Sequence, residues 1–170
     1  MSLRLILVRH AKSSWDDLMV DDHDRVLNRR GRATAPLMAR FLATHGHRPA
    51  LVVSSTARRT LETWDRMAPI FGGTDMPPLH PEPKLYHASA DTMLAVLHRC
   101  PPSTVMMLGH NPGIGDFASD LLAEQPRHPS FHAYPTCATL VADFPARRWS
   151  EVRFGTGRVV DFAIPADMTD

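Results

Sequence analysis

The sequence contains few cysteines and little excess of either charge. Its 170 residues include two cysteines, Cys100 and Cys137, which form no Cys-x-x-Cys pair and are too few for a disulfide framework. This usage fits a reducing compartment, so we expect the cytoplasm. The formal net charge of +1 is too small to indicate nucleic acid or an anionic membrane as the main partner.

Long hydrophobic runs are also absent. No window reaches the roughly 18 apolar residues of a membrane span, and the apolar run after Arg4 is too short for a signal peptide. We therefore expect neither membrane insertion nor export. Hydrophobic residues make up 44% and charged residues 22% of the chain, which is typical of a globular protein and not of a disordered, collagen-like or coiled-coil one.

The alternation of strand-like and helix-like segments predicts the architecture. The length of 170 residues suits one domain, 1–170, with a core of its own. Strands are expected at 3–8, 51–53, 104–108, 136–144 and 151–154, the last two as an antiparallel pair. Helices are expected from 32 to a stop at Gly46, after a cap within 54–56 up to 71, from a cap at Asp91 to about 99, and from 112 to about 122. This order predicts a three-layer α/β/α fold with a mostly parallel central sheet.

The segments between these elements are polar or rich in proline and glycine. Residues 11–28 are expected to form a long loop, with the acidic stretch 21–24 exposed to solvent. Residues 72–83 are expected to form a loop or a short irregular edge, and 125–135 a loop to which no role is assigned. The tryptophans are expected to pack rather than to stack on a ligand. They are Trp15, Trp64 and Trp149.

Polar residues suited to holding a phosphoryl group follow three of the expected strands. These groups are Arg9-His10, the segment 55–59, and Gly109-His110-Asn111. Ligands of an open α/β sheet bind beyond the carboxyl ends of its strands, so we expect the three groups to share one pocket. Two arginines and two imidazoles in that pocket would make a trap for an anion.

The parts of a nucleotide or metal site are missing. No glycine-rich loop with Lys-Ser/Thr is present, and no carboxylate cluster has the spacing of a magnesium site. Two histidine pairs, His45 with His47 and His128 with His132, lack an evident third ligand. We therefore expect no cofactor and no metal.

Four motifs occur in order along the first two thirds of the chain. Residues 9–15 contain Arg-His-Ala-Lys-Ser-Ser-Trp, 25–31 Arg-x-Leu-Asn-x-x-Gly, 54–63 Ser-Ser-Thr-x-x-Arg-x-x-x-Thr, and 109–112 Gly-His-Asn-Pro. Together they resemble the histidine phosphatases related to phosphoglycerate mutase, specifically the short SixA-type branch of phosphohistidine phosphatases. Ala11 stands where the wider family has glycine, and Thr56 where it has proline. The resemblance covers about 3–123 and implies a phosphoglycerate mutase-like fold.

The resemblance also implies roles for individual residues. His10 is expected to attack phosphorus and to carry the phosphoryl group as phosphohistidine, which suits an imidazole that is largely neutral at physiological pH. Arg9, Arg59 and His110 are expected to bind the phosphoryl oxygens. Further substrate contacts are expected from Ser13 and Asn111.

Other charged residues near these motifs have weaker assignments. Arg58 is expected to face solvent, because the alignment places the family arginine at Arg59. Asp16 receives no phosphate role, since a carboxylate repels phosphate. No residue matches the acid that protonates the leaving group in larger relatives, although Asp91 and Glu62 are alternatives. Glu62 suits the surface of a helix.

The expected function is that of a metal-independent phosphatase that forms a phosphohistidine intermediate on His10. An imidazole leaves phosphorus more readily than an alkoxide without help from an acid, so phosphohistidine on a protein is the favoured substrate. The expected partner is accordingly a phosphorylated protein or a small phosphorylated substrate. Three alternatives stay open: a phosphatase or mutase of small phosphoesters in the same superfamily, a non-catalytic phosphate-binding domain, and a metal-dependent hydrolase.

Overall fold

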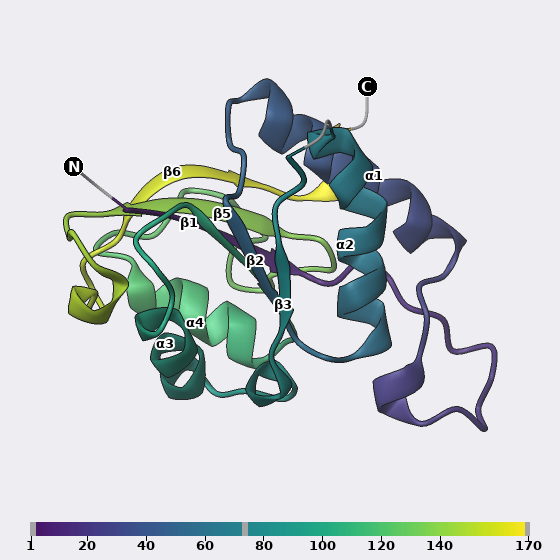
Figure 1. Cartoon of the computed structure of the whole chain (residues 1–170). Helices are drawn as coiled ribbons and strands as arrows, with labels where there is room; N and C mark the ends of the chain where they lie inside the picture. The colour runs from purple at the N-terminus through teal and green to yellow at the C-terminus, as the bar shows by residue number, and fades with distance from the viewer. Residues whose placement is uncertain (1–2, 73–74, 169–170) are drawn as a thin grey trace.

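Six strands form one sheet in the computed structural model, which describes residues 3–72 and 75–168 (Figure 1). Their order across the sheet is β3-β2-β4-β1-β5-β6. The strands are β1 Leu3–Arg9, β2 Leu51–Ser54, β3 Leu79–Pro81, β4 Val105–Gly109, β5 Thr139–Phe144 and β6 Arg158–Ala163. The first four in this order run parallel, whereas β5 and β6 are antiparallel to their neighbours. The prediction of a mostly parallel central sheet is confirmed.

Helices cover both faces of this sheet, two on each face (Figure 1). One pair is α1 Arg29–Thr44 and α2 Arg58–Phe71, and the other is α3 Ala90–His98 and α4 Gly113–Leu121. Short 3-10 turns complete the described elements: η1 Asp22–Asp24, η2 Pro83–Leu85, η3 Trp149–Glu151 and η4 Pro165–Met168. The three-layer α/β/α prediction is therefore confirmed.

The central strand β1 contributes to the core on both sides of the sheet. Successive side chains of a strand point to opposite faces. Leu5 and Leu7 are accordingly buried in the cluster that contains the apolar residues of α3 and α4. Ile6 and Val8 are buried with those of α1 and α2. Burial on both faces holds the end of β1, and the residues that follow it, in a fixed position.

Capping side chains set the starts of two helices differently from the prediction. The Asn28 side chain accepts a hydrogen bond from Gly31 N at 2.9 Å, so α1 begins at Arg29 and runs on through Pro36. At α3 the cap is Ser89, whose hydroxyl accepts from Thr92 N at 3.2 Å. Asp91, predicted as this cap, lies in the first turn instead.

The last strand lies later in the chain than predicted. The segment 151–154 is not a strand, because the η3 turn buries Trp149 and lets its indole N–H donate to Ser103 O at 3.1 Å. Gly155 then turns the chain with a positive φ of 77°. β6 follows this turn and pairs antiparallel with β5, as expected for the late pair.

The tryptophans divide between the core and the surface. Trp64 and Trp149 are buried, as predicted, whereas Trp15 is 68% exposed and the packing prediction for it is wrong. The ring of Trp15 is instead covered by the guanidinium of Arg25, 3.5 Å from the ring centroid. Within 3–72 and 75–168, no helix has the length and apolar character needed to cross a membrane.

Candidate active site

Two neighbouring parallel strands bring the two motif histidines together. β1 and β4 pair in register, with Arg9 opposite Gly109, so His10 and His110 leave the sheet side by side. His10 N donates to Gly109 O at 3.2 Å, and the two imidazole centroids lie 5.3 Å apart. β2 lies on the other side of β4 and leads into α2, which carries Arg59. The structure thus gathers the three strand ends at one edge of the sheet.

The hydrogen bond of the His10 ring defines its tautomer. Nδ1 lies 2.7 Å from Ala11 O, and because a carbonyl oxygen only accepts, Nδ1 carries the hydrogen. Burial lowers the pKa of His10 to about 3, and the charges of three nearby arginines act in the same direction. The ring is therefore neutral at physiological pH, and Nε2 holds a free lone pair.

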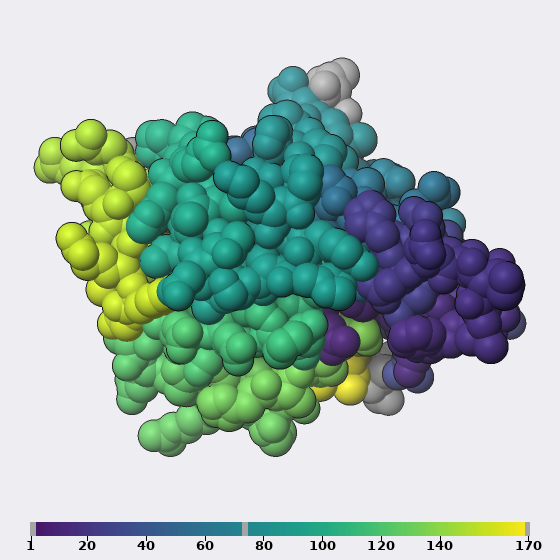
Figure 2. Space-filling model, turned by 90° about the horizontal axis from the view of Figure 1, so that it is seen from below, coloured from purple at the N-terminus to yellow at the C-terminus, as the bar shows by residue number. Residues whose placement is uncertain are grey.

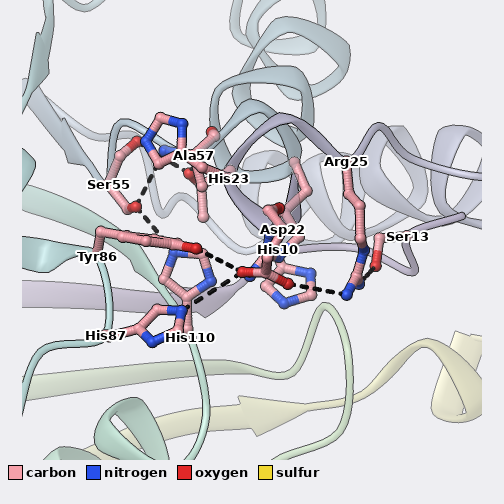
Figure 3. Close-up of polar contacts among 12 residues, drawn as sticks. His10, Ser13, Asp22, His23, Arg25, Ser55, Ala57, Tyr86, His87 and His110 are labelled. Atoms are coloured by element: carbon pink, nitrogen blue, oxygen red, sulfur yellow. Dashed lines mark hydrogen bonds and ion pairs between the residues drawn. The ribbon is translucent and has the colours of Figure 1, made fainter. Parts of the chain in front are cut away.

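His110 is held by a serine from the end of β2. Its Nε2 lies 2.8 Å from Ser55 Oγ, and that hydroxyl oxygen already accepts from Ala57 N at 3.2 Å (Figure 3). Nε2 is the one acceptor available to the hydroxyl hydrogen of Ser55 among the described residues, so Ser55 donates to Nε2 and the ring hydrogen lies on Nδ1. Burial lowers the pKa of His110 to about 2. Its Nδ1–H is buried and has no hydrogen-bond partner among the described residues.

This use of Ser55 departs from the prediction for α2. The expected side-chain cap within 54–56 is absent: α2 has Ala57 at its N-cap position, without a side-chain hydrogen bond. Ser55 instead joins the backbone before α2 to His110. Arg58 and Arg59 do fall in the first turn of α2, as predicted; Arg58 is exposed, whereas Arg59 is buried.

The arginines of the site keep part of their hydrogen-bonding capacity unused. Arg9 Nη1 donates to Tyr134 O at 3.1 Å, and Arg59 Nη1 donates to Asp22 O at 2.7 Å. Burial and the charge of Arg59 lower the pKa of Arg9. Within the described residues, the buried side-chain nitrogens without any partner all belong to this site. They are the Nε atoms of Arg9, Arg25 and Arg59, and Nδ1 of His110.

Asp22 contacts several of these site residues, although the sequence predicts it in a solvated loop. The Asp22 carboxylate accepts from Arg59 Nη2 at 3.1 Å, from Arg25 Nη1 at 3.0 Å and from Tyr86 OH at 2.5 Å (Figure 3). His87 Nε2 lies 3.4 Å from the same carboxylate. Burial opposes ionisation of Asp22, but the bonds from Tyr86 and Arg59 outweigh it and lower the pKa of this carboxyl.

Sequence reasoning missed Asp22, Tyr86 and His87 as members of the site. The Tyr86 ring lies edge-on to the His110 ring, with the two centroids 5.5 Å apart. The centroid of the His87 ring lies 6.2 Å from that of His110. Arg25, by contrast, is the first residue of the Arg-x-Leu-Asn-x-x-Gly motif, so the sequence does indicate its place near the site. For the segment 86–87 the sequence offers only its place before a predicted helix.

The predicted substrate contacts lie beside the histidines, but their polar atoms already have protein partners. Arg25 Nη2 donates to Ser13 Oγ. Asn111 Nδ2 donates to Ala133 O at 2.9 Å and to Tyr134 O at 3.1 Å, while its Oδ1 accepts from Gly115 N. Both residues thereby hold loops around the site, and a direct contact with substrate stays a prediction.

Neither acid considered from the sequence has a contact with this site. Glu62 Oε1 accepts from Leu27 N at 2.9 Å, and the residue lines a separate groove next to Arg58 and Arg66. Asp91 is exposed on α3. Asp16 is exposed on the loop after β1, where its backbone N–H donates to Ser14 Oγ.

Two glycines allow the loops to approach the site closely. A Cβ at Gly113 would stand 1.8 Å from Ala88 O, and one at Gly31 would stand 2.1 Å from Lys12 O. The first contact packs the start of α4 against the segment that carries Tyr86 and His87. A cavity of about 350 Å³ opens beside it, with His87, His110 and Asn111 in its wall.

Across 3–72 and 75–168, no group of three or more His, Cys, Asp or Glu side chains is arranged to hold a metal ion. The active site contains two neutral imidazoles with buried arginines around them. Neutral histidines and buried cations at the strand ends of an α/β sheet are suited to an enzyme that binds and transfers phosphoryl groups.

Comparison with known proteins specifies this class. Residues 5–93 match the model of the histidine phosphatase superfamily, branch 1. An uncharacterized chloroplastic protein of Arabidopsis thaliana is 38% identical over 130 residues, which span 71% of this chain and 60% of that protein. A candidate phosphohistidine phosphatase SixA from Agrobacterium tumefaciens is 30% identical, with a TM-score of 0.78 over 96% of this chain and 98% of that one.

A further solved structure supports the fold. The protein histidine phosphatase SixA complexed with tungstate superimposes with a TM-score of 0.79 at 19% identity, over 98% of this chain and all (100%) of that one. The chain belongs to the histidine phosphatase superfamily and has the phosphoglycerate mutase-like fold. By class it is a phosphatase.

Proposed function

We propose that this phosphatase removes the phosphoryl group from phosphohistidine on a protein, through a covalent intermediate on His10. One observation carries the proposal. Every buried side-chain nitrogen that lacks a partner in the described residues belongs to Arg9, Arg25, Arg59 or His110, and three of these are positively charged. Buried donors without partners are costly, so this set is suited to an anion with several oxygens.

The neutral His10 ring supplies the nucleophile. Its Nε2 lone pair forms a bond to phosphorus while the bond between phosphorus and the leaving nitrogen breaks, and the leaving ring keeps that electron pair. The substrate reacts with a hydrogen on its other ring nitrogen, so the leaving group departs as neutral imidazole without an acid. Phosphorylation at Nε2 leaves the hydrogen on Nδ1, where Ala11 O at 2.7 Å stabilises the positive ring. Arg9, Arg59 and His110 bind the three oxygens as charge shifts between the attacking and leaving atoms. Water then attacks phosphorus, loses a proton and releases phosphate, which restores neutral His10.

The leaving group decides the substrate class. Glu62 is bound to Leu27 N and lines a separate groove, and Asp91 is exposed on α3, so neither is held at His10 to protonate an alkoxide. Asp116 is the one carboxylate in the wall of the cavity beside His110 among the described residues. Tyr86 and His87 also lie beside the His110 ring, and Asp22 binds both of them. The cavity of about 350 Å³ beside His110 offers room for a leaving group the size of an imidazole. These features favour a nitrogen-phosphorus bond over an alkyl phosphoester.

Further parts of the proposal follow from the sequence. We propose a single domain over 1–170 and a location in the cytoplasm, which the two free thiols, Cys100 and Cys137, support. Burial raises the pKa of Cys100 to about 11 and that of Cys137 to about 12, so neither thiol competes as a nucleophile.

A direct comparison of substrates tests the proposal. We expect phosphohistidine, free and in a protein, to be hydrolysed with a higher kcat/KM than sugar phosphates and other alkyl phosphates, with no loss of activity in chelator. A preference for sugar phosphates would reject phosphohistidine as the substrate and favour a small-molecule phosphatase or mutase of the same superfamily. Absence of turnover with every substrate, together with tight phosphate binding, would favour a non-catalytic phosphate-binding domain.

A further inference from the structure

The loop between β1 and α1 displays most of the exposed large apolar side chains of the described structure. They are Trp15, Leu18, Met19, Val20 and Val26, and the one other such residue is Met76. Leu18 is 85% and Met19 is 92% exposed. We call these five residues the apolar patch. Such a concentration on one short segment is unusual for a surface that contacts only water.

The loop that carries the apolar patch is fixed at its base. Arg25 donates to Ser13 and to Asp22, and His23 Nε2 lies 2.9 Å from Thr56 Oγ1, ahead of α2. At the tip, the Asp17 carboxylate accepts from Met19 N at 3.0 Å. Figure 2 shows this purple segment as a lobe beside the main body of the molecule. The base contacts join the patch to the active site through Asp22 and Arg59.

Acidic residues dominate the part of the loop that carries most of the apolar patch, while Arg25 lies at its base over the Trp15 ring. Residues 13–24 contain five aspartates and no lysine or arginine. Asp22 is bound by arginines, but Asp16, Asp17, Asp21 and Asp24 are exposed. An acidic rim repels a free phosphate dianion and attracts a basic surface. A small phosphorylated metabolite would gain nothing from Leu18 and Met19.

We propose that the apolar patch is the docking surface for the phosphorylated protein, and that it binds a segment with basic and apolar side chains next to the phosphohistidine. This inference rests on the proposed function and specifies its substrate. The apolar side chains supply binding energy on contact, and the carboxylates favour a partner with lysine or arginine. The base contacts connect the loop that carries the patch to Asp22 and Arg59 in the active site.

Binding of synthetic peptides tests the docking surface without relying on turnover. One peptide has a central histidine flanked by lysine and leucine, and a matched peptide replaces each lysine by glutamate. By calorimetry on the unphosphorylated peptides, we expect the basic one to bind about tenfold more tightly. The variant Leu18→Ser/Met19→Ser should weaken that binding by about tenfold, whereas Met76→Ser should leave it unchanged. Asp16→Asn/Asp24→Asn should weaken it and reduce its salt dependence.

Kinetics with the phosphorylated peptides separates docking from catalysis. We expect Leu18→Ser/Met19→Ser to lower kcat/KM for the basic phosphopeptide about tenfold and to leave kcat/KM for free phosphohistidine within about twofold. Equal binding of both peptides, or no effect of the double variant, would overturn the docking proposal. So would a dimer in sedimentation that this variant dissociates, since the occupant would then be a second copy. If no phosphohistidine compound is hydrolysed, the proposed function fails, while peptide binding still decides the docking surface.

Discussion

Asp22 binds both terminal nitrogens of Arg59, through its backbone carbonyl at 2.7 Å and its carboxylate at 3.1 Å. Arg59 is also the residue that the family motif assigns to the phosphoryl oxygens. An incoming phosphoryl group therefore competes with Asp22 for the same guanidinium, and the negative charge of Asp22 opposes its entry.

Removal of that charge should strengthen anion binding. We expect Asp22→Asn, which keeps the size of the side chain, to lower the inhibition constant of tungstate about fivefold. Asp24→Asn is the matched control, since Asp24 lies on the same 3-10 turn and is exposed. Weaker tungstate inhibition in Asp22→Asn would show that Asp22 assists anion binding instead of competing with it.

Neighbouring arginines at the start of α2 provide a second test. Arg59 is 5% exposed and bound to Asp22, whereas Arg58 is exposed. Lysine cannot reproduce the planar fork of arginine, so Arg59→Lys should lower kcat/KM by about 100-fold or more, and Arg58→Lys should change it by less than about twofold. Similar losses in both variants would reject the assignment of the motif arginine to Arg59.

The close contact at Gly113 predicts a loss of both stability and activity. In Gly113→Ala the new Cβ would meet Ala88 O, so α4 and the segment with Tyr86 must separate. We expect a loss of about 2 kcal/mol or more in the free energy of unfolding, measured in denaturant, and a lower kcat. At Gly109 a Cβ meets only ends of flexible side chains, the nearest being Met93 Cε at 3.5 Å. Gly109→Ala should be the milder change; the reverse order would contradict the packing described.

The buried neutral histidines predict a loss of stability in acid. Their pKa values of about 3 and about 2 lie below the ordinary value of about 6.5, so the unfolded chain binds more protons between these limits. The contribution of these neutral rings to the free energy of unfolding is therefore fully present above about pH 6.5 and is lost as the pH falls toward 3. We expect the free energy of unfolding, measured in urea, to fall less from pH 7 to pH 5 in His10→Gln/His110→Gln than in the wild type. The control His80→Gln changes an exposed ring; an unchanged pH dependence in the double variant would contradict this account.

The sheet and the histidine pair could be predicted because their signals are local. β1 and β4 are apolar runs that end in Arg9-His10 and Gly109-His110, and neighbouring parallel strands must bring such ends together. The alternation of strands and helices then specifies the layers. Neither step requires knowledge of how distant side chains meet.

The acidic loop could not be predicted in this way. A run of aspartates is usually solvated, and Asp22 acquires its role only from Arg59 and Tyr86, which lie 37 and 64 residues further along the chain. Likewise, the segment 151–154 has the composition of a strand. It does not form one, because a 3-10 turn over 149–151 buries Trp149 there. Both features depend on tertiary contacts that residue patterns do not encode.

Trapping of the intermediate tests the central claim most directly. Mass spectrometry of the wild-type enzyme, quenched at high pH during turnover of phosphohistidine, should show one acid-labile phosphoryl group on His10. His10→Ala should show neither the adduct nor turnover, while tungstate still binds through Arg9 and Arg59. Retained activity in His10→Ala, or a phosphoryl group that forms on His110 instead, would contradict the account.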